Sequence, residues 1–116
     1  MNRQAWLELR KKGIGASDAS AVVGMNPYKT NVELWEEKTG RRESEDISGK
    51  PYVKYGIEAE APLRKLFFLD FPQYKGTYKP YDVIYHPVYH FLFATLDGRL
   101  KEIETSRKGT LEVKTT

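Results

Sequence analysis

The spacing of apolar residues near the start of the chain predicts two short helices. Trp6, Leu7 and Arg10 lie at helix-like spacing within residues 4–11, and a basic pair followed by glycine supplies the end of that helix. Ser17 follows the flexible segment 13–15 and is well placed to cap a second helix over residues 18–23. Both helices are expected to be short because glycine and an Asn-Pro turn interrupt the pattern.

Two further helices are predicted between residues 32 and 69. Thr30 or Asn31 is expected to cap a helix over residues 32–39, with Leu34 and Trp35 pointing inward. The apolar residues of segment 51–69 recur at roughly helical spacing and predict the longest helix, broken or bent near its internal proline. We expect this helix to pack on a sheet.

The C-terminal half is rich in aromatic and branched residues separated by turn signals, which predicts three or four antiparallel strands. The expected strands cover residues 78–86, 91–94, 100–104 and 110–115. Segment 41–50 is charged and lacks aromatic residues, which predicts an exposed loop within the domain. The pattern as a whole predicts an α+β fold.

Composition narrows the class of protein but does not decide its function. A chain of 116 residues with 40% hydrophobic content fits one domain over residues 1–116. The net charge of +3 permits nucleic-acid binding without demanding it. The absence of cysteine excludes disulfides and cysteine zinc sites and agrees with a reducing cytoplasm. No apolar run approaches the length of a membrane span, so no membrane partner is expected.

The candidate chemistry lies at the end of the chain. In a strand over Leu111-Glu112-Val113-Lys114, the charged side chains would share one face and the apolar ones would enter the other. An upstream Asp97 turned toward the polar face would add a second carboxylate. Two carboxylates and one ammonium are the minimum for holding a divalent metal against a phosphodiester. The alternatives are a solvated strand face and, for Asp97, a plain turn residue before glycine.

An ordered series of motifs resembles the YqaJ family of phage recombination exonucleases, which is related to the lambda-exonuclease family. The series consists of Trp6-x-x-x-Arg10, Gly13-Ile14-Gly15-Ala16-Ser17-Asp18-Ala19, Asn26-Pro27-Tyr28, Leu34-Trp35-x-x-Lys38-Thr39-Gly40, Gly56-x-x-x-Glu60, His86-Pro87, Ala94-Thr95-Leu96-Asp97-Gly98 and Leu111-Glu112-Val113-Lys114. The resemblance implies a restriction-endonuclease-like PD-(D/E)xK core, with N-terminal helices packed on a mixed, mainly antiparallel sheet. That fold continues with a further helix and strand, so we expect this chain to be truncated after the E-x-K strand.

The resemblance also implies a metal site and its ligands. Asp97 and Glu112 would hold Mg²⁺ or Mn²⁺, and the carbonyl of Val113 would add another oxygen. Glu60 would approach the same metal directly or through water, and its neighbour Glu58 is the alternative on that helix. Lys114 would orient or help deprotonate the attacking water.

A second implied site is a pocket for a terminal 5′ phosphate, formed by Arg10 and Ser17. Ser17 at a helix N-terminus would favour an anion, and Arg10 could form a bidentate pair with it. Ser17 acting only as a helix cap is the alternative. The implied function is a metal-dependent DNA exonuclease acting 5′ to 3′ on duplex ends in the cytoplasm of a bacterial or phage-infected cell. The alternative is a catalytically silent fragment that binds DNA ends or a protein partner.

Remaining features have weaker implications. The family resemblance suggests a single-strand annealing protein as partner, and an exposed sheet edge would favour a homo-oligomer. His86 and His90 flank a predicted hairpin, where a rim or packing role is favoured over metal binding. The aromatic and basic pairs suggest base stacking and duplex contacts, but sheet packing and solvated surface explain most of them. These pairs are Tyr74-Lys75, Tyr78-Lys79, Lys11-Lys12 and Arg41-Arg42.

Overall fold

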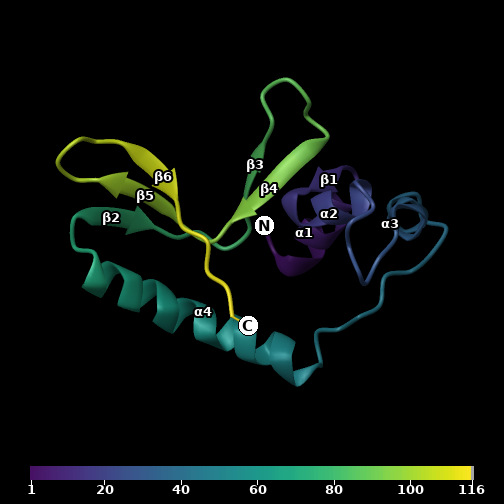
Figure 1. Cartoon of the computed structure of the whole chain (residues 1–116), viewed down its shortest axis with the longest axis horizontal. Helices are drawn as coiled ribbons and strands as arrows, with labels where there is room; N and C mark the ends of the chain where they lie inside the picture. The colour runs from purple at the N-terminus through teal and green to yellow at the C-terminus, as the bar shows by residue number, and fades with distance from the viewer. Residues whose placement is uncertain (116) are drawn as a thin grey trace. The chain divides into compact units, whose positions relative to one another are not determined.

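A computed structural model of the protein describes residues 1–115, which divide into two compact units. Unit 1 contains residues 1–44 and 81–95, and unit 2 contains residues 45–80 and 96–115. Unit 1 combines several short helices with a three-stranded sheet, and unit 2 combines one long helix with another three-stranded sheet (Figure 1). The predicted α+β class is therefore confirmed, with mixed and antiparallel sheets that are compatible with a nuclease-like fold.

The helices of unit 1 are α1 (Arg3–Arg10), a 3-10 turn (Ala16–Asp18), α2 (Ala19–Val22) and α3 (Asn31–Lys38). Two of them, α1 and α3, begin at a side-chain cap. The Asn2 side chain accepts a hydrogen bond from the backbone N–H of Ala5 (2.8 Å), and Thr30 accepts one from that of Glu33 (3.1 Å). These bonds satisfy N–H groups that have no partner within the helix. Of the two predicted caps for α3, Thr30 is the one observed.

The sheet of unit 1 contains β1 (Ile14–Gly15), β3 (Asp82–Tyr85) and β4 (Leu92–Leu96). Leu96, the last residue of β4, is counted with unit 2. The strand order is β1-β4-β3, and β1 runs parallel to β4 with Gly15 opposite Phe93. A Cβ at Gly15 would lie 2.9 Å from the Phe93 ring, so this close approach requires glycine. The buried apolar side chains Ala21, Leu34 and Phe93 form the centre of the unit.

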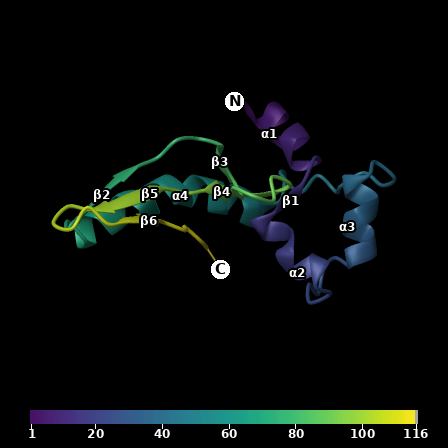
Figure 2. The ribbon, with the colours of Figure 1, turned by 90° about the horizontal axis from the view of Figure 1, so that it is seen from above.

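Unit 2 consists of one long helix on an antiparallel sheet. Its elements are α4 (Pro51–Asp70), β2 (Tyr74–Thr77), β5 (Arg99–Glu102) and β6 (Lys108–Thr110), in the order β2-β5-β6. Figure 2 shows α4 running beneath these strands. The rings of Phe67 and Tyr74 stack at 6.0 Å, and the Phe68 ring covers Gly76 of β2. The predicted packing of this helix on a sheet is confirmed, but α4 continues through Pro62 without a break.

The strand predictions were less accurate than the helix predictions. The predicted strand 110–115 was wrong, because β6 covers Lys108–Thr110 and residues 111–115 lie outside any strand. β1 and β2 were not predicted, and β1 pairs in parallel rather than antiparallel fashion. β1 has only two residues, too few to carry a periodic pattern, so its pairing with β4 defines it.

Two side-chain predictions in unit 1 were also wrong. Trp35 was expected to point inward, but it is 52% exposed, with the Arg41 guanidinium 4.4 Å from its ring centroid. Ser17 was expected to cap a helix, but it lies inside the 3-10 turn and caps nothing. The carboxylate of Asp18 instead reaches back to Gly15, the residue before the turn, and accepts its backbone N–H (2.9 Å).

Residues 41–50 contain no helix or strand in the structure, and nearly all of them are exposed. A single domain over residues 1–116 stays a prediction. None of the helices within residues 1–115 combines the length and apolar character needed to span a bilayer.

Candidate functional site

Asp97 lies directly after β4, and its carboxylate contacts the end of the chain. Asp97 Oδ2 accepts a hydrogen bond from the backbone N–H of Val113 (2.9 Å), and the Gly98 carbonyl accepts one from Leu111 (2.9 Å). These two bonds align segment 111–113 with the Asp97-Gly98 turn. The predicted neighbourhood of Asp97 and the E-x-K motif is therefore present in unit 2, although the segment is not a strand.

The side chains of this segment alternate as a strand would place them. Leu111 and Val113 are half-buried, while the Glu112 and Lys114 side chains are 71% and 75% exposed. Glu112 Oε1 and Lys114 Nζ lie 3.5 Å apart and form an ion pair. The charged side chains and the packed apolar side chains thus lie on opposite faces of the segment, and the two charged groups neutralise one another.

Glu60 reaches the Asp97 turn through an arginine that sequence reasoning missed. Arg64 lies one helical turn after Glu60 on α4, and its Nη2 donates to Glu60 Oε1 (2.6 Å). Arg64 Nε donates to the Asp97 carbonyl oxygen (3.0 Å), and its guanidinium carbon lies 3.5 Å from the ring centroid of Tyr78. The Arg64 side chain is only 11% exposed. Its i,i+4 spacing from Glu60 was the available sequence signal, whereas Glu58 is exposed.

The negative charges of Glu60 and Asp97 interact, which favours a cation bound near them. Burial raises the pKa of Glu60, the negative charge of Asp97 raises it further, and Arg64 opposes both effects. Carboxylate oxygens are ligands that Mg²⁺ and Mn²⁺ prefer, so the donor chemistry of Glu60 and Asp97 fits such an ion. Residues 1–115 nevertheless contain no group of three His, Cys, Asp or Glu residues arranged to hold a metal.

The second predicted pair, Arg10 and Ser17, is in direct contact in unit 1. Arg10 Nη2 donates to Ser17 Oγ (2.9 Å), and the guanidinium carbon of Arg10 lies 4.8 Å from the ring centroid of Trp6. The indole N–H of Trp6 donates to Thr95 Oγ1 (3.0 Å). Trp6 therefore supports the cation of Arg10 and is itself fixed to β4.

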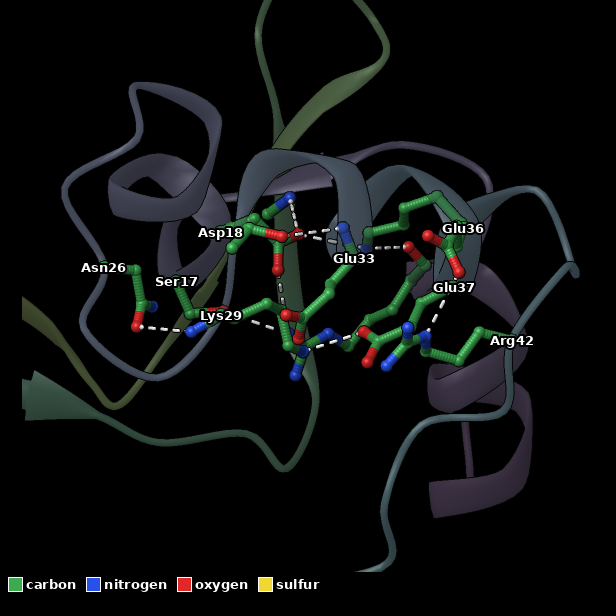
Figure 3. Close-up of polar contacts among 12 residues, drawn as sticks. Ser17, Asp18, Asn26, Lys29, Glu33, Glu36, Glu37 and Arg42 are labelled. Atoms are coloured by element: carbon green, nitrogen blue, oxygen red, sulfur yellow. Dashed lines mark hydrogen bonds and ion pairs between the residues drawn. The ribbon is translucent and has the colours of Figure 1, made fainter.

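A buried carboxylate that sequence reasoning missed links this pair to α3. Asp18, labelled in Figure 3, is 8% exposed. Its Oδ2 accepts the Gly15 N–H and lies 3.0 Å from Lys38 Nζ. Its Oδ1 lies 3.9 Å from Arg10 Nη2, and Lys38 Nζ also donates to the Arg10 carbonyl (2.6 Å). Asp18 and Lys38 both lie within the family-like motifs of the sequence, but the contact between them depends on tertiary packing.

The other candidate groups have structural partners. His86 Nδ1 accepts the backbone N–H groups of Val88 (3.1 Å) and Tyr89 (2.9 Å), so it holds the hairpin turn. His90 Nε2 lies 3.0 Å from the Pro87 carbonyl in the same turn. Among the tyrosines, Tyr74 stacks on Phe67 and Tyr78 lies against Arg64, which are packing contacts. Lys11 pairs with Glu8 and Arg42 with Glu36, both at 3.2 Å.

Comparisons with known proteins agree with the resemblance found in the motifs. The model of the YqaJ-like viral recombinase domain matches residues 5–116. A protein of Bacillus subtilis (strain 168) named uncharacterized protein YqaJ is 38% identical over 117 residues. That match covers 100% of this chain but 34% of the relative, so the chain spans about a third of the relative's length. No solved structure matches the chain. The chain therefore belongs to the family of YqaJ-like viral recombinase domains.

Proposed function

We propose that this chain is part of a metal-dependent DNA exonuclease that hydrolyses phosphodiester bonds, 5′ to 3′ from duplex ends. The observation that carries the proposal is the hydrogen bond from Val113 N–H to the Asp97 carboxylate, because it joins Asp97 to the E-x-K motif. Membership in a recombinase family supports a recombination nuclease with DNA as substrate. The PD-(D/E)xK core is part of the same proposal.

Each group at the end of the chain has a proposed role. Asp97, Glu112 and the Val113 carbonyl would hold Mg²⁺ or Mn²⁺, and Glu60 would complete the ligand set directly or through water. The bound ion would offset phosphate charge and lower the pKa of coordinated water. Lys114, which is exposed and ion-paired in this structure, would turn to the scissile phosphate and orient the attacking water.

End recognition is assigned to unit 1. Arg10 and Ser17 present a guanidinium and a hydroxyl 2.9 Å apart, a pair suited to a terminal phosphate monoester. An exonuclease needs such a group because the terminal phosphate distinguishes an end from internal duplex.

Cleavage of a 5′-phosphorylated linear duplex by the purified chain tests the proposal. We expect digestion with Mg²⁺ or Mn²⁺ and none with chelator. Glu112→Gln and Lys114→Ala should slow digestion about a hundredfold or more, because general acid–base and charge-stabilising groups contribute on that scale. Glu104→Gln, an exposed acid in the β5–β6 turn, is the matched control. Wild-type digestion rates in folded Glu112→Gln would overturn the assignment.

Two observations favour a second candidate function, a catalytically silent module that binds DNA ends. Glu112 is paired with Lys114, and residues 1–115 hold no three-residue metal cluster. This candidate predicts salt-sensitive binding to duplex ends that chelator does not change, with no digestion under any metal condition.

Self-association and a protein partner are also part of the proposal. Several apolar side chains of unit 1 are well exposed, including Val23, Met25 and Tyr28. We propose self-association of the chain and, in the cell, contact with a single-strand annealing protein. Sedimentation of the purified chain at rising concentration tests the first proposal, which a constant monomer mass would contradict.

A further inference from the structure

We propose that Asp18 is a positioning residue that makes the Arg10 pocket selective for a terminal phosphate monoester over the phosphodiesters of the DNA backbone. This inference rests on the proposed role of Arg10 and Ser17 in binding the 5′ end. Asp18 would act through Arg10 and Lys38 and would not itself touch the DNA.

The first argument is that Asp18 is a buried charge whose contacts converge on the pocket. It is 8% exposed, and a charge so placed requires partners. Its Oδ2 accepts the Gly15 N–H (2.9 Å) and faces the Lys38 ammonium (3.0 Å), which leaves Oδ1 directed toward Arg10 (3.9 Å). The carboxylate is thus fixed in orientation by the 3-10 turn and by α3.

The second argument concerns how Arg10 is held. Its guanidinium lies against the Trp6 ring (4.8 Å), donates to Ser17 (2.9 Å) and faces Asp18, while Lys38 binds its backbone carbonyl (2.6 Å). The side chain remains 29% exposed, so solvent and an anion reach it. A preorganised guanidinium loses less side-chain entropy on binding, and its planar donors demand one orientation of the phosphate oxygens.

The charge of the cluster separates an orienting role of Asp18 from a purely electrostatic one. Arg10 and Lys38 supply two positive charges and Asp18 one negative charge, so the pocket carries a net +1. A backbone phosphodiester carries one negative charge, whereas a phosphate monoester carries about −1.5 to −2 at neutral pH. The extra attraction for the monoester scales with the positive charge of the pocket, so charge alone would raise the discrimination when Asp18 is removed. A fall in discrimination on that change can therefore come only from the loss of the orientation that Asp18 imposes on Arg10.

The test measures binding of this chain to two matched duplexes, one 5′-phosphorylated and one 5′-hydroxyl, in chelator so that no digestion occurs. We expect the wild-type chain to prefer the phosphorylated end. Asp18→Asn keeps an oxygen that accepts the Gly15 N–H but removes the charged partner that orients Arg10. It should lower the ratio of the two affinities about tenfold, the scale of one charge-assisted hydrogen bond, whereas a purely electrostatic role of Asp18 would make the ratio rise. Affinity for the 5′-hydroxyl duplex should be kept or raised, whereas general structural damage would lower both affinities.

Glu37→Gln is the matched control, because Glu37 is a mostly buried acid of unit 1 whose ion pair is with Lys29 (2.7 Å). It should leave the affinity ratio unchanged. Asp18→Ser provides a second variant in case Asp18→Asn does not fold, because its hydroxyl oxygen can also accept the Gly15 N–H while no charge faces Arg10. The affinity ratio should fall in this variant as well.

The outcomes separate the two levels of the proposal. A wild-type chain that binds both duplexes equally would overturn the Arg10–Ser17 assignment itself. A wild-type preference that persists unchanged or rises in folded Asp18→Asn, or in folded Asp18→Ser when the first variant does not fold, would overturn the role of Asp18 alone.

Discussion

At the scale of single residues, Glu60 is a carboxylate whose surroundings disfavour its charged form. Burial and the charge of Asp97 raise its pKa above the usual value of 4.5, despite the partial compensation by Arg64. The folded chain therefore binds the Glu60 proton more tightly than the unfolded chain does. The resulting contribution to stability is fully present below pH 4.5 and is lost as pH rises through the higher folded pKa.

Glu60→Gln should remove this pH-dependent contribution. Subtracting the free energy of unfolding of the wild type from that of the variant should give a difference that grows as pH rises from about 4 to about 7, because the wild type alone acquires the disfavoured charge. Urea unfolding across that range measures it. A difference that shrinks toward neutral pH would mean that Arg64 outweighs burial and Asp97.

Arg64 connects α4 to the Asp97 turn, so its loss should be costly. Arg64→Met keeps most of the apolar stem but removes the donors to Glu60 and to the Asp97 carbonyl. We expect destabilisation of about 2 kcal/mol, the usual cost of leaving partly buried polar groups unpaired. Lys65→Met, at the adjacent exposed position, should change the free energy of unfolding by less than about 0.5 kcal/mol. Equal losses in the two variants would contradict the role assigned to Arg64.

How far these residues could be predicted depends on whether their roles are local. Asp97 and the E-x-K segment could be identified from the residues themselves, and Glu60 was implied by the resemblance to the YqaJ family, because each lies in a short contiguous motif. Asp18 and Arg64 lie in the same motifs or one turn away, but their importance comes from burial against segments distant in sequence. Burial against distant segments leaves no periodic pattern in the sequence.

At the scale of elements, the helices were predicted more accurately than the strands, because the hydrogen bonds of a helix are local whereas a strand depends on a partner. Thr30 could be recognised as a cap from its own neighbourhood. β1 is defined by its pairing with β4, and segment 111–115 has strand-like alternation without a ladder. Alternation thus predicted which side chains face inward more reliably than it predicted hydrogen bonding.

The packing of α4 on its sheet leads to a prediction about two glycines. Gly76 and Gly109 both pair with Leu100, on opposite sides of β5, but only a Cβ at Gly76 would overlap the Phe68 ring. Gly76→Ala should therefore destabilise the chain by about 1–3 kcal/mol, the range for overpacking. Gly109→Ala, where an added Cβ meets nothing within 4 Å, is the control. Thermal unfolding of both variants decides whether helix and strand are in this contact in solution.

At the scale of the whole molecule, a net charge of +3 leaves little general attraction for DNA, so binding should depend on a few localised cations. With about two phosphate contacts, affinity for a duplex end should fall about tenfold between roughly 50 and 200 mM salt. Binding measured across that range checks the expectation. A slope several times steeper would mean that the basic pairs on the surface also contact the duplex.

The different settings of the two tryptophans give the molecule an intrinsic optical reporter. Trp6 lies under the Arg10 guanidinium with its indole N–H bonded to Thr95, while Trp35 is half open to solvent beside Arg41. In Trp35→Phe, emission would come from one indole beside the proposed phosphate pocket. Titration with inorganic phosphate or a short phosphorylated duplex would then change the colour or intensity of that emission, so that occupancy of the pocket could be followed in real time without any label on the DNA.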